Sequence, residues 1–195
     1  MRKSPKLQRK IIEALTILIA RWSRHQQIRP SPGIVKVNLG SSLRVAPGWI
    51  NVDGSLSALV ARWPTAALKT VYRLTSVKEW YTQTEYIDIL RTHQFVFHNF
   101  DFGIPFPDES IDFIYTSHML EHLYEENAER LVTECFRTLK RNGRIRIVVP
   151  DLEYAISLYQ RGAKEEALAL FFLRSSSGLL GRHESCMISI YLPRC

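Results

Sequence analysis

Residues 95–118 constrain the fold more than any other part of the chain. They read as two buried strands, Phe95 to Phe100 and Ile111 to Tyr115, separated by a turn that contains Pro105, Pro107 and Asp108. The first strand leads to Asp101, and the second leads to Thr116, Ser117 and His118, where we expect a helix to begin. Polar residues that follow buried strands in this way are typical of the ligand-binding edge of an α/β sheet.

The next segment predicts a helix and a further strand. Between Asn127 and Leu139, apolar residues recur at helical spacing and define one face. Asn142-Gly143 supplies a left-handed stop, and Ile145 to Val149 reads as another strand, closed by Pro150. A strand, a helix and a strand at this spacing predict a right-handed parallel crossover.

Upstream, two short strands flank a loop of small residues. The segment Ile34 to Leu39 reads as a buried strand that runs into Gly40-Ser41-Ser42, and the segment Trp49 to Val52 reads as a second strand that ends at Asp53. In nucleotide sites such a loop lets the ligand approach the backbone, and an acid after the next strand accepts hydrogen bonds from ribose hydroxyls. The alternative interpretation is that Asp53 and Asp101 are only turn or helix-cap residues.

The positive charge of the chain lies in its first 29 residues. The net charge is +7, and residues 1–29 hold eight Lys or Arg and one acid, so the remainder is balanced. The chain of 195 residues can bury one core, and we divide it into a basic amphipathic arm, 1–29, and a domain, 30–195. The domain shows no basic stripe, which argues against nucleic acid as a partner.

The arm has two interpretations. Ile11, Leu15 and Leu18 recur at helical spacing with Lys and Arg around them. Such a helix packs on the sheet, or it lies in weak contact with an anionic membrane surface. It is too short and too polar to cross a bilayer. The three cysteines form no C-x-x-C pair, so we expect a reducing, cytoplasmic setting and no metal ribbon.

Together these segments resemble the class I S-adenosylmethionine-dependent methyltransferases, and most closely the type 11 methyltransferase domain. The resemblance rests on Val37 to Gly40, Pro47 to Asp53, Asp101 to Pro107, Ser117 to Leu123 and Val149 to Glu153. It implies a three-layer, Rossmann-like fold with a mainly parallel sheet, S-adenosylmethionine as cofactor, and methyl transfer to a small-molecule or saccharide-like acceptor.

The resemblance also implies roles for individual residues. Gly40 and Ser41 would form the loop at the methionine side of the cofactor, Asp53 would bind the ribose, Asp101 with Phe102 would contact the adenine, and Ser117 with His118 would lie beside the methyl group. The full set of expected cofactor-binding residues is Asn38, Gly40, Ser41, Asp53, Asp101, Phe102 and Ser117. His118 is the candidate catalytic base, and Asp151 and Tyr154 are candidates to orient the acceptor.

The sequence departs from the family pattern in three places. Ser42 stands where a second loop glycine is usual, and only nine residues separate Leu39 from Trp49, so the helix between these two strands should be absent or reduced. After the segments Leu152 to Tyr159 and Glu165 to Leu173, which read as helices, only Met187 to Leu192 could supply a closing strand. We therefore expect the closing C-terminal strands to be lacking and an edge of the sheet to be uncovered.

Three other functions compete with the methyltransferase. An inactive methyltransferase-like remnant or binding module would explain Ser42 and the short end of the chain. A different Rossmann-type nucleotide enzyme would need a fuller glycine loop than the chain has. Finally, His118 to His122 spells H-x-x-E-H, the pattern of inverted zinc peptidases. Such a motif needs both histidines on one helix face and a third ligand, so we expect no metal site here.

Overall fold

The chain forms an α/β fold around one mainly parallel sheet. The computed structural model describes residues 19, 21, 25–169 and 187–193. Within these residues the strand order is β3-β2-β1-β4-β5-β6, with β6 antiparallel to β5 and the other pairs parallel. The strands are β1 Lys36–Leu39, β2 Ile50–Asp53, β3 Gln94–Phe97, β4 Ile111–Ser117, β5 Leu139–Pro150 and β6 Met187–Pro193.

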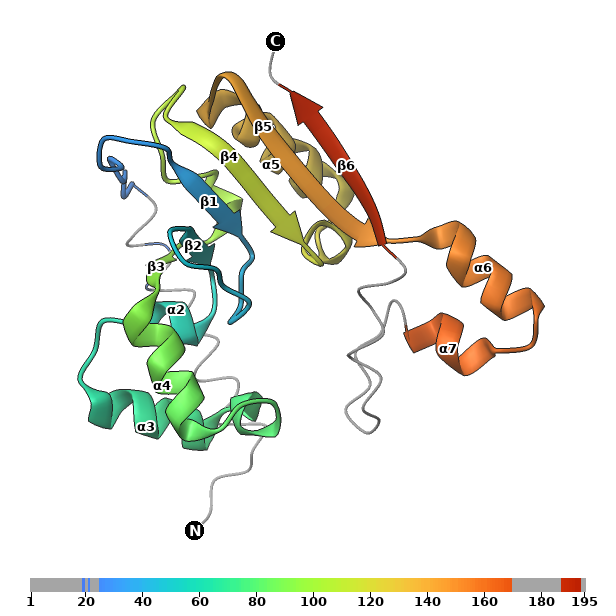
Figure 1. Ribbon diagram of the computed structural model, residues 1–195, viewed down its shortest axis with the longest axis horizontal. Helices are drawn as coiled ribbons and strands as arrows, with labels where there is room; N and C mark the ends of the chain where they lie inside the picture. Colours follow the sequence, from blue (N-terminus) through green and yellow to red (C-terminus); the bar gives the residue numbers. More distant parts are fainter. Residues whose placement is uncertain (1–18, 20, 22–24, 170–186, 194–195) are drawn as a thin grey trace.

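Helices connect the parallel strands. The α-helices are α2 Leu56–Val60, α3 Thr65–Leu74, α4 Gln83–Thr92, α5 Glu125–Thr138, α6 Leu152–Gln160 and α7 Lys164–Ala169, and the 3-10 turns are η1 Ser76–Glu79, η2 Phe100–Phe102 and η3 Leu120–His122. Helix α5 lies behind the β4–β5 half of the sheet, while α2, α3 and α4 gather at the β3 end (Figure 1). The α6–α7 pair projects beyond the end of β5 (Figure 1).

Two hydrophobic clusters cover the opposite faces of the sheet. One unites Val37, Ile114 and their neighbours with Leu131 and Cys135 of α5. The other joins the apolar sides of α2, α3 and α4 to Phe95. Phe95 and Val96 are adjacent in β3 but belong to different clusters, as the alternation of side chains along a strand requires. This arrangement confirms the predicted three-layer fold.

Most of the predicted elements form. The helix expected from Asn127 is α5, and its apolar face buries Leu131 and Cys135. Asn142 does adopt a left-handed conformation, with φ +66°, although it lies inside β5 rather than at the end of α5. The connection from β1 to β2 contains no helix, as expected from its length. The helices expected after Pro150 are α6 and α7, and α7 is described to Ala169.

Strand β6 supplies the one closing strand that the end of the chain was expected to be able to form. Its backbone pairs with β5 from Arg144↔Pro193 to Pro150↔Met187, so the edge of β5 is not left open. The candidate strand at Met187–Leu192 is therefore confirmed as a closing strand. The apolar helix expected in the N-terminal arm falls almost wholly outside the described residues, so it and the division at residue 29 stay predictions.

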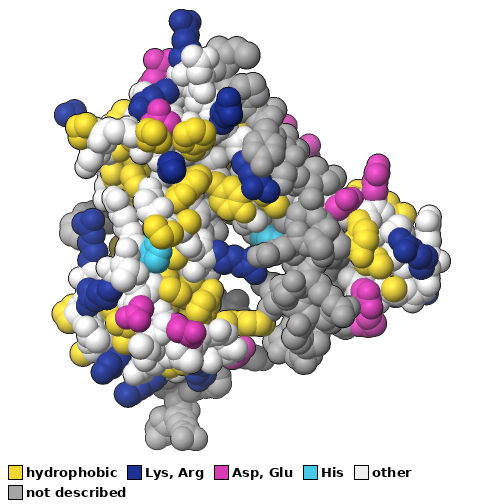
Figure 2. All heavy atoms as spheres, in the orientation of Figure 1, with side chains coloured by type: hydrophobic (Ala, Val, Ile, Leu, Met, Phe, Trp, Pro, Cys, Tyr) yellow, Lys and Arg dark blue, Asp and Glu magenta, His cyan; other side chains and the backbone are white. Residues whose placement is uncertain are grey.

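No described helix is both long enough and apolar enough to span a membrane. The α6–α7 pair instead presents hydrophobic side chains at the surface, and Figure 2 shows such groups on its visible face. The exposed hydrophobic residues of this pair are Leu152, Tyr154, Ile156, Tyr159 and Leu168.

Candidate functional site

Four neighbouring parallel strands bring most of the predicted site residues to one edge of the sheet. Because β3, β2, β1 and β4 run parallel, their carboxyl ends share an edge. Backbone hydrogen bonds join the segments that follow these strands: Gly40 N–H donates to the Val52 carbonyl at 2.9 Å, and His98 N–H donates to the Asp53 carbonyl at 3.1 Å. Ser117, the last residue of β4, ends at the same edge.

Asp53 ties two loops together at the centre of this edge. Its side chain is 8% exposed, and its Oδ2 accepts a hydrogen bond from Ser42 N–H at 2.7 Å. Its Oδ1 accepts from Ser55 N–H, also at 2.7 Å. The cap of α2 is Ser55, not Asp53. A carboxylate has about four lone-pair sites, so two acceptor sites remain for hydroxyl donors. Asp53 therefore has the turn role, and its predicted binding of a ribose stays a prediction.

The loop after β1 has the backbone of a glycine-rich loop. Gly40 adopts φ +66°, and a Cβ built at this position would lie 2.5 Å from Met119 Sδ. Ser42 adopts φ +47°, a left-handed conformation in which glycine is favoured. This explains why the family pattern has glycine at the position of Ser42. Ser41 is buried, and its hydroxyl donates weakly to the Ser42 carbonyl at 3.4 Å.

Asn38 is buried inside the sheet and braces the loop that follows β1. Its Nδ2 donates to the Arg44 carbonyl at 2.9 Å and to Asn51 Oδ1 at 3.2 Å. Asn51 in turn donates to the carbonyl groups of Trp49 and Gln94. The geometry shows a structural role for Asn38, and its predicted contact with a cofactor stays a prediction.

Asp101 and Phe102 lie on an exposed turn beyond β3. The strand ends at Phe97, three residues earlier than predicted, because Asn99 Oδ1 accepts a hydrogen bond from Asp101 N–H at 3.0 Å and starts the turn η2. The Asp101 carboxylate is exposed and Phe102 is 38% exposed, so both side chains are accessible to a ligand. Gly103 ends the turn at φ +82°.

A network on α5 fixes the segment that follows this turn. Glu134 Oε2 accepts from Ile104 N–H at 3.0 Å and from Arg137 Nη2 at 2.7 Å. Arg137 also donates to the carbonyl groups of Ile104 and Phe106 and to Asp108. Hydrogen bonding to Arg137 lowers the pKa of Glu134. The loop between β3 and β4 is thus held to the body of the domain.

The expected helix after β4 does not form at Ser117. His118 has φ +53°, which stops any helix there, and Met119 packs against Gly40. A short 3-10 turn follows, and α5 begins only at Glu125. The prediction that a helix begins at Thr116 to His118 is therefore wrong.

His118 is oriented by a carboxylate. Its Nδ1 lies 3.1 Å from Glu121 Oε1, and its side chain is 27% exposed.

The H-x-x-E-H pattern lacks the geometry of a zinc peptidase. His118 lies at the end of a strand and His122 lies in a 3-10 turn, so the two histidines do not share a helix face. No group of three or more His, Cys, Asp or Glu side chains within the described residues could hold a metal ion.

Two buried polar groups at this edge were not predicted. His98 is 1% exposed, and its Nε2 lies 3.1 Å from the Gly103 carbonyl. Since a carbonyl only accepts, the proton is on Nε2 and Nδ1 is an acceptor; among the described residues neither this Nδ1 nor Thr116 Oγ1 has a hydrogen-bond partner. Burial lowers the pKa of His98. His98 sits inside a run that reads as an apolar strand, so no sequence pattern distinguishes it, whereas Thr116 is one of the polar residues expected after Tyr115.

The residues proposed to orient the acceptor lie at the start of α6. Asp151 caps this helix, and its Oδ1 accepts from Tyr154 N–H at 3.1 Å. Tyr154 is 38% exposed. They follow β5, whose Val148 pairs with Ser117 at the end of β4.

The parallel sheet, the loop after β1 and the acid after β2 define a Rossmann-like α/β domain. Residues 54–147 match the model of a family described as a methyltransferase domain. That segment belongs to this family, which confirms the resemblance seen in the sequence. The cofactor that the family implies is S-adenosylmethionine. No curated protein matches the chain.

Solved structures with a similar arrangement share little sequence with this chain. The YcgJ protein of Bacillus subtilis is 17% identical with a TM-score of 0.38, over 70% of this chain and 50% of that one. A SAM-dependent methyltransferase of Aquifex aeolicus is 14% identical with a TM-score of 0.39, over 84% and 89%. Geranyl diphosphate C-methyltransferase of Streptomyces coelicolor is 16% identical with a TM-score of 0.43, over 94% and 77%. The chain thus spans half the length of the Bacillus protein.

Proposed function

We propose that this chain is an S-adenosylmethionine-dependent methyltransferase that acts on a small-molecule or saccharide-like acceptor. The observation that carries the proposal is the shared edge of β1, β2, β3 and β4, where Gly40, Asp53 and Ser117 meet within a chain whose residues 54–147 match the methyltransferase family. When bound, the cofactor supplies an electrophilic methyl group.

The residues at the edge suit the parts of this cofactor. The Asp53 carboxylate, with two acceptor sites left, would bind the ribose hydroxyls. Asp101 and Phe102, both accessible, would contact the adenine by hydrogen bonding and by ring contact. The positive φ of Gly40 lets the backbone approach the methionine part, and Ser41 and Asn38 support this loop.

His118 is the proposed general base. Methyl transfer is an in-line displacement, so much of the rate comes from alignment, and a base is needed where the acceptor hydroxyl or amine must lose a proton. Glu121 Oε1 lies 3.1 Å from Nδ1 and orients the ring, and we assign the transfer of that proton to this imidazole. Asp151 and Tyr154 would orient the acceptor from the adjacent strand end.

The remaining predictions about cellular context belong to the same proposal. The acceptor is a small molecule rather than nucleic acid, the setting is cytoplasmic, and any membrane contact is weak and made by the basic arm, residues 1–29. Vesicle sedimentation of the full chain with and without anionic lipid tests this contact.

Calorimetric titration with S-adenosylhomocysteine tests the proposed cofactor site without knowledge of the acceptor. Micromolar binding is expected. Asp101→Ala should weaken it about 10-fold, the value of one hydrogen bond to a charged group, and leave the urea midpoint unchanged because the side chain is exposed. Asp88→Ala on α4, which removes the same charge elsewhere, should bind like the parent protein. Absence of binding by well-folded protein would favour the inactive remnant.

A further inference from the structure

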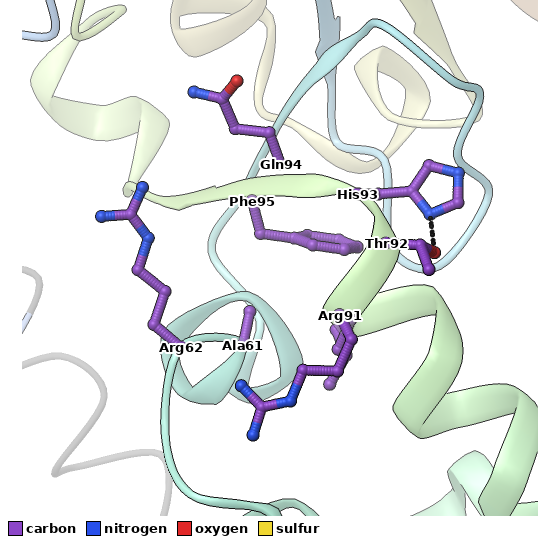
Figure 3. A pocket seen from close by; sticks show the side chains of 8 residues that line it. Ala61, Arg62, Arg91, Thr92, His93, Gln94 and Phe95 are labelled. Atoms are coloured by element: carbon purple, nitrogen blue, oxygen red, sulfur yellow. Dashed lines mark hydrogen bonds between the residues drawn. The ribbon is translucent and has the colours of Figure 1, made fainter.

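A hollow of about 430 Å³ lies at the opposite edge of the sheet from the candidate site. It adjoins the amino end of β3, and its described lining residues are Ala61, Arg62, Leu90, Arg91, Thr92, His93, Gln94 and Phe95. Figure 3 shows Arg62 and Arg91 on either side of Ala61. None of the residues assigned to the methyltransferase site lines it.

The floor and the rim of this hollow differ in chemistry. Ala61, Leu90 and Phe95 are each 3–6% exposed and form an apolar floor. The side chains of Arg62 and Arg91 are exposed and form a cationic rim. A volume of this size accommodates a small organic ligand.

The two arginines of the rim have no carboxylate partner within the described residues. Arg91 Nη2 donates to the Trp63 carbonyl at 2.7 Å and to Thr65 Oγ1 at 3.3 Å, both neutral acceptors. No hydrogen bond or ion pair of the described residues involves the Arg62 side chain. Helix α3 begins at Thr65, which Arg91 contacts, and it has no acidic residue in its first turn. By contrast, Arg137 pairs with two carboxylates.

His93 adds a polar group to the rim. Thr92 Oγ1 donates to the Asp88 carbonyl at 2.6 Å, so it accepts from His93 Nδ1, which also lies 3.1 Å from the Ile89 carbonyl. The proton therefore sits on Nδ1. The Arg91 guanidinium is anchored separately, to the chain before α3 and to its first residue.

We propose that this hollow is a binding site for a small organic phosphate. Two guanidinium groups without carboxylate partners match the charge of a phosphate monoester, about −1.5 to −2 at neutral pH. Guanidinium forks bind phosphate oxygens by paired, charge-assisted hydrogen bonds. The apolar floor would take the organic part of the ester. The site is separate from the methyl-transfer edge, so it stands or falls independently of the proposed function.

Amide chemical shifts of ¹⁵N-labelled full-length protein during titration with phenyl phosphate test this proposal. We expect saturable shifts at Ala61, Arg62 and residues 90–95, and weaker binding of inorganic phosphate, which has no group for the floor. Arg62→Gln should weaken phenyl phosphate binding about 10-fold. Arg62 is exposed and has no hydrogen bond or ion pair among the described residues, so this change should leave the unfolding midpoint unaltered.

Arg73→Gln is the matched control, because Arg73 is an exposed arginine of α3 that does not line the hollow. It should bind like the parent protein. Equal losses in Arg62→Gln and Arg73→Gln, or shifts that do not saturate, would overturn the proposal. Sedimentation with phosphatidic acid vesicles distinguishes a soluble phosphate ester from a lipid headgroup. If the protein binds these vesicles in a way that requires Arg62 but does not bind phenyl phosphate, the ligand is a lipid headgroup and the proposal as stated is refuted.

Discussion

Gly40 allows the sharpest test of how the loop after β1 is built. The residue has φ +66°, and an added Cβ would lie 2.5, 2.7 and 2.9 Å from Sδ, Cγ and Cβ of Met119. Because the Met119 Cβ is among these atoms, rotation of its side chain cannot clear the overlap. Gly48 is the matched control: it has φ +77°, but no atom of the described residues lies within 4 Å of an added Cβ.

The expected losses of unfolding free energy follow from the surroundings of these two glycines. Gly48→Ala should cost about 1–2 kcal/mol of unfolding free energy, the penalty of a left-handed alanine. Gly40→Ala carries the same penalty plus about 1–3 kcal/mol of overpacking against Met119. Met119→Ala alone removes a side chain that is 9% exposed and should cost about 2–4 kcal/mol.

The double variant Gly40→Ala, Met119→Ala then decides the argument. The new methyl group occupies part of the space vacated by the thioether, so the double variant should be at least about 1 kcal/mol more stable than the two single changes predict together. The remaining contact at the Met119 Cβ makes this rescue partial. Urea unfolding followed by circular dichroism measures all variants, with the midpoint read at a constant slope.

Two results would refute this reasoning. The first is a Gly40→Ala variant no less stable than Gly48→Ala, which would show that Met119 does not fill the space beside Gly40. The second is additivity of the double variant to within about 0.5 kcal/mol, as for independent sites.

Three further predictions concern titratable groups. Hydrogen bonding to Arg137 lowers the pKa of Glu134 below its ordinary 4.5, so the carboxylate stabilises the fold above that pH and this stability is lost as pH falls through the lower folded-state pKa. Glu134→Gln should therefore be less stable than the parent protein at neutral pH and should lose less stability on acidification. Unchanged urea unfolding curves would contradict this. Burial lowers the pKa of His98 below 6.5, so the folded state should lose stability as pH falls below about 6.5. The amide of His98→Gln can still donate to the Gly103 carbonyl, so this variant should remove the pH dependence of the urea midpoint between pH 7 and 5. Burial raises the pKa of the Cys135 thiol to about 12, so iodoacetamide should not alkylate Cys135 in folded protein at neutral pH and should alkylate it in urea. Mass spectrometry of the labelled protein measures this. Rapid labelling of the folded form would show that α5 opens easily.

Elements with a strong local pattern could be predicted from the sequence. The spacing of Leu131 and Cys135 gives α5, and the buried runs give β1, β4 and β5, because burial on one helix face or on both strand faces leaves a direct record in residue type. The order of polar residues after these strands also gives the edge at which Gly40 and Asp53 meet.

The structural features that the sequence did not predict arise from tertiary interactions. The helix expected at Ser117 is prevented by the left-handed His118, and no residue pattern marks that conformation in a histidine. Strand β3 ends early because the Asn99 side chain competes for a backbone N–H. The bracing role of Asn38 depends on Asn51 in the neighbouring strand, a partner that only the register of β1 and β2 reveals.

The order of strands in the sheet has a consequence for how the chain folds during synthesis. The central strand β1 pairs with β2 nearby, but its other partner is β4, and the hydrogen bond from Val35 N–H to Asp112 spans 77 residues. Contacts of such high sequence separation carry a large loop-closure cost and slow folding. A nascent chain that has not yet reached Ser117 leaves one side of β1 without a partner, so the emerging amino-terminal half should depend on chaperones until β4 has left the ribosome.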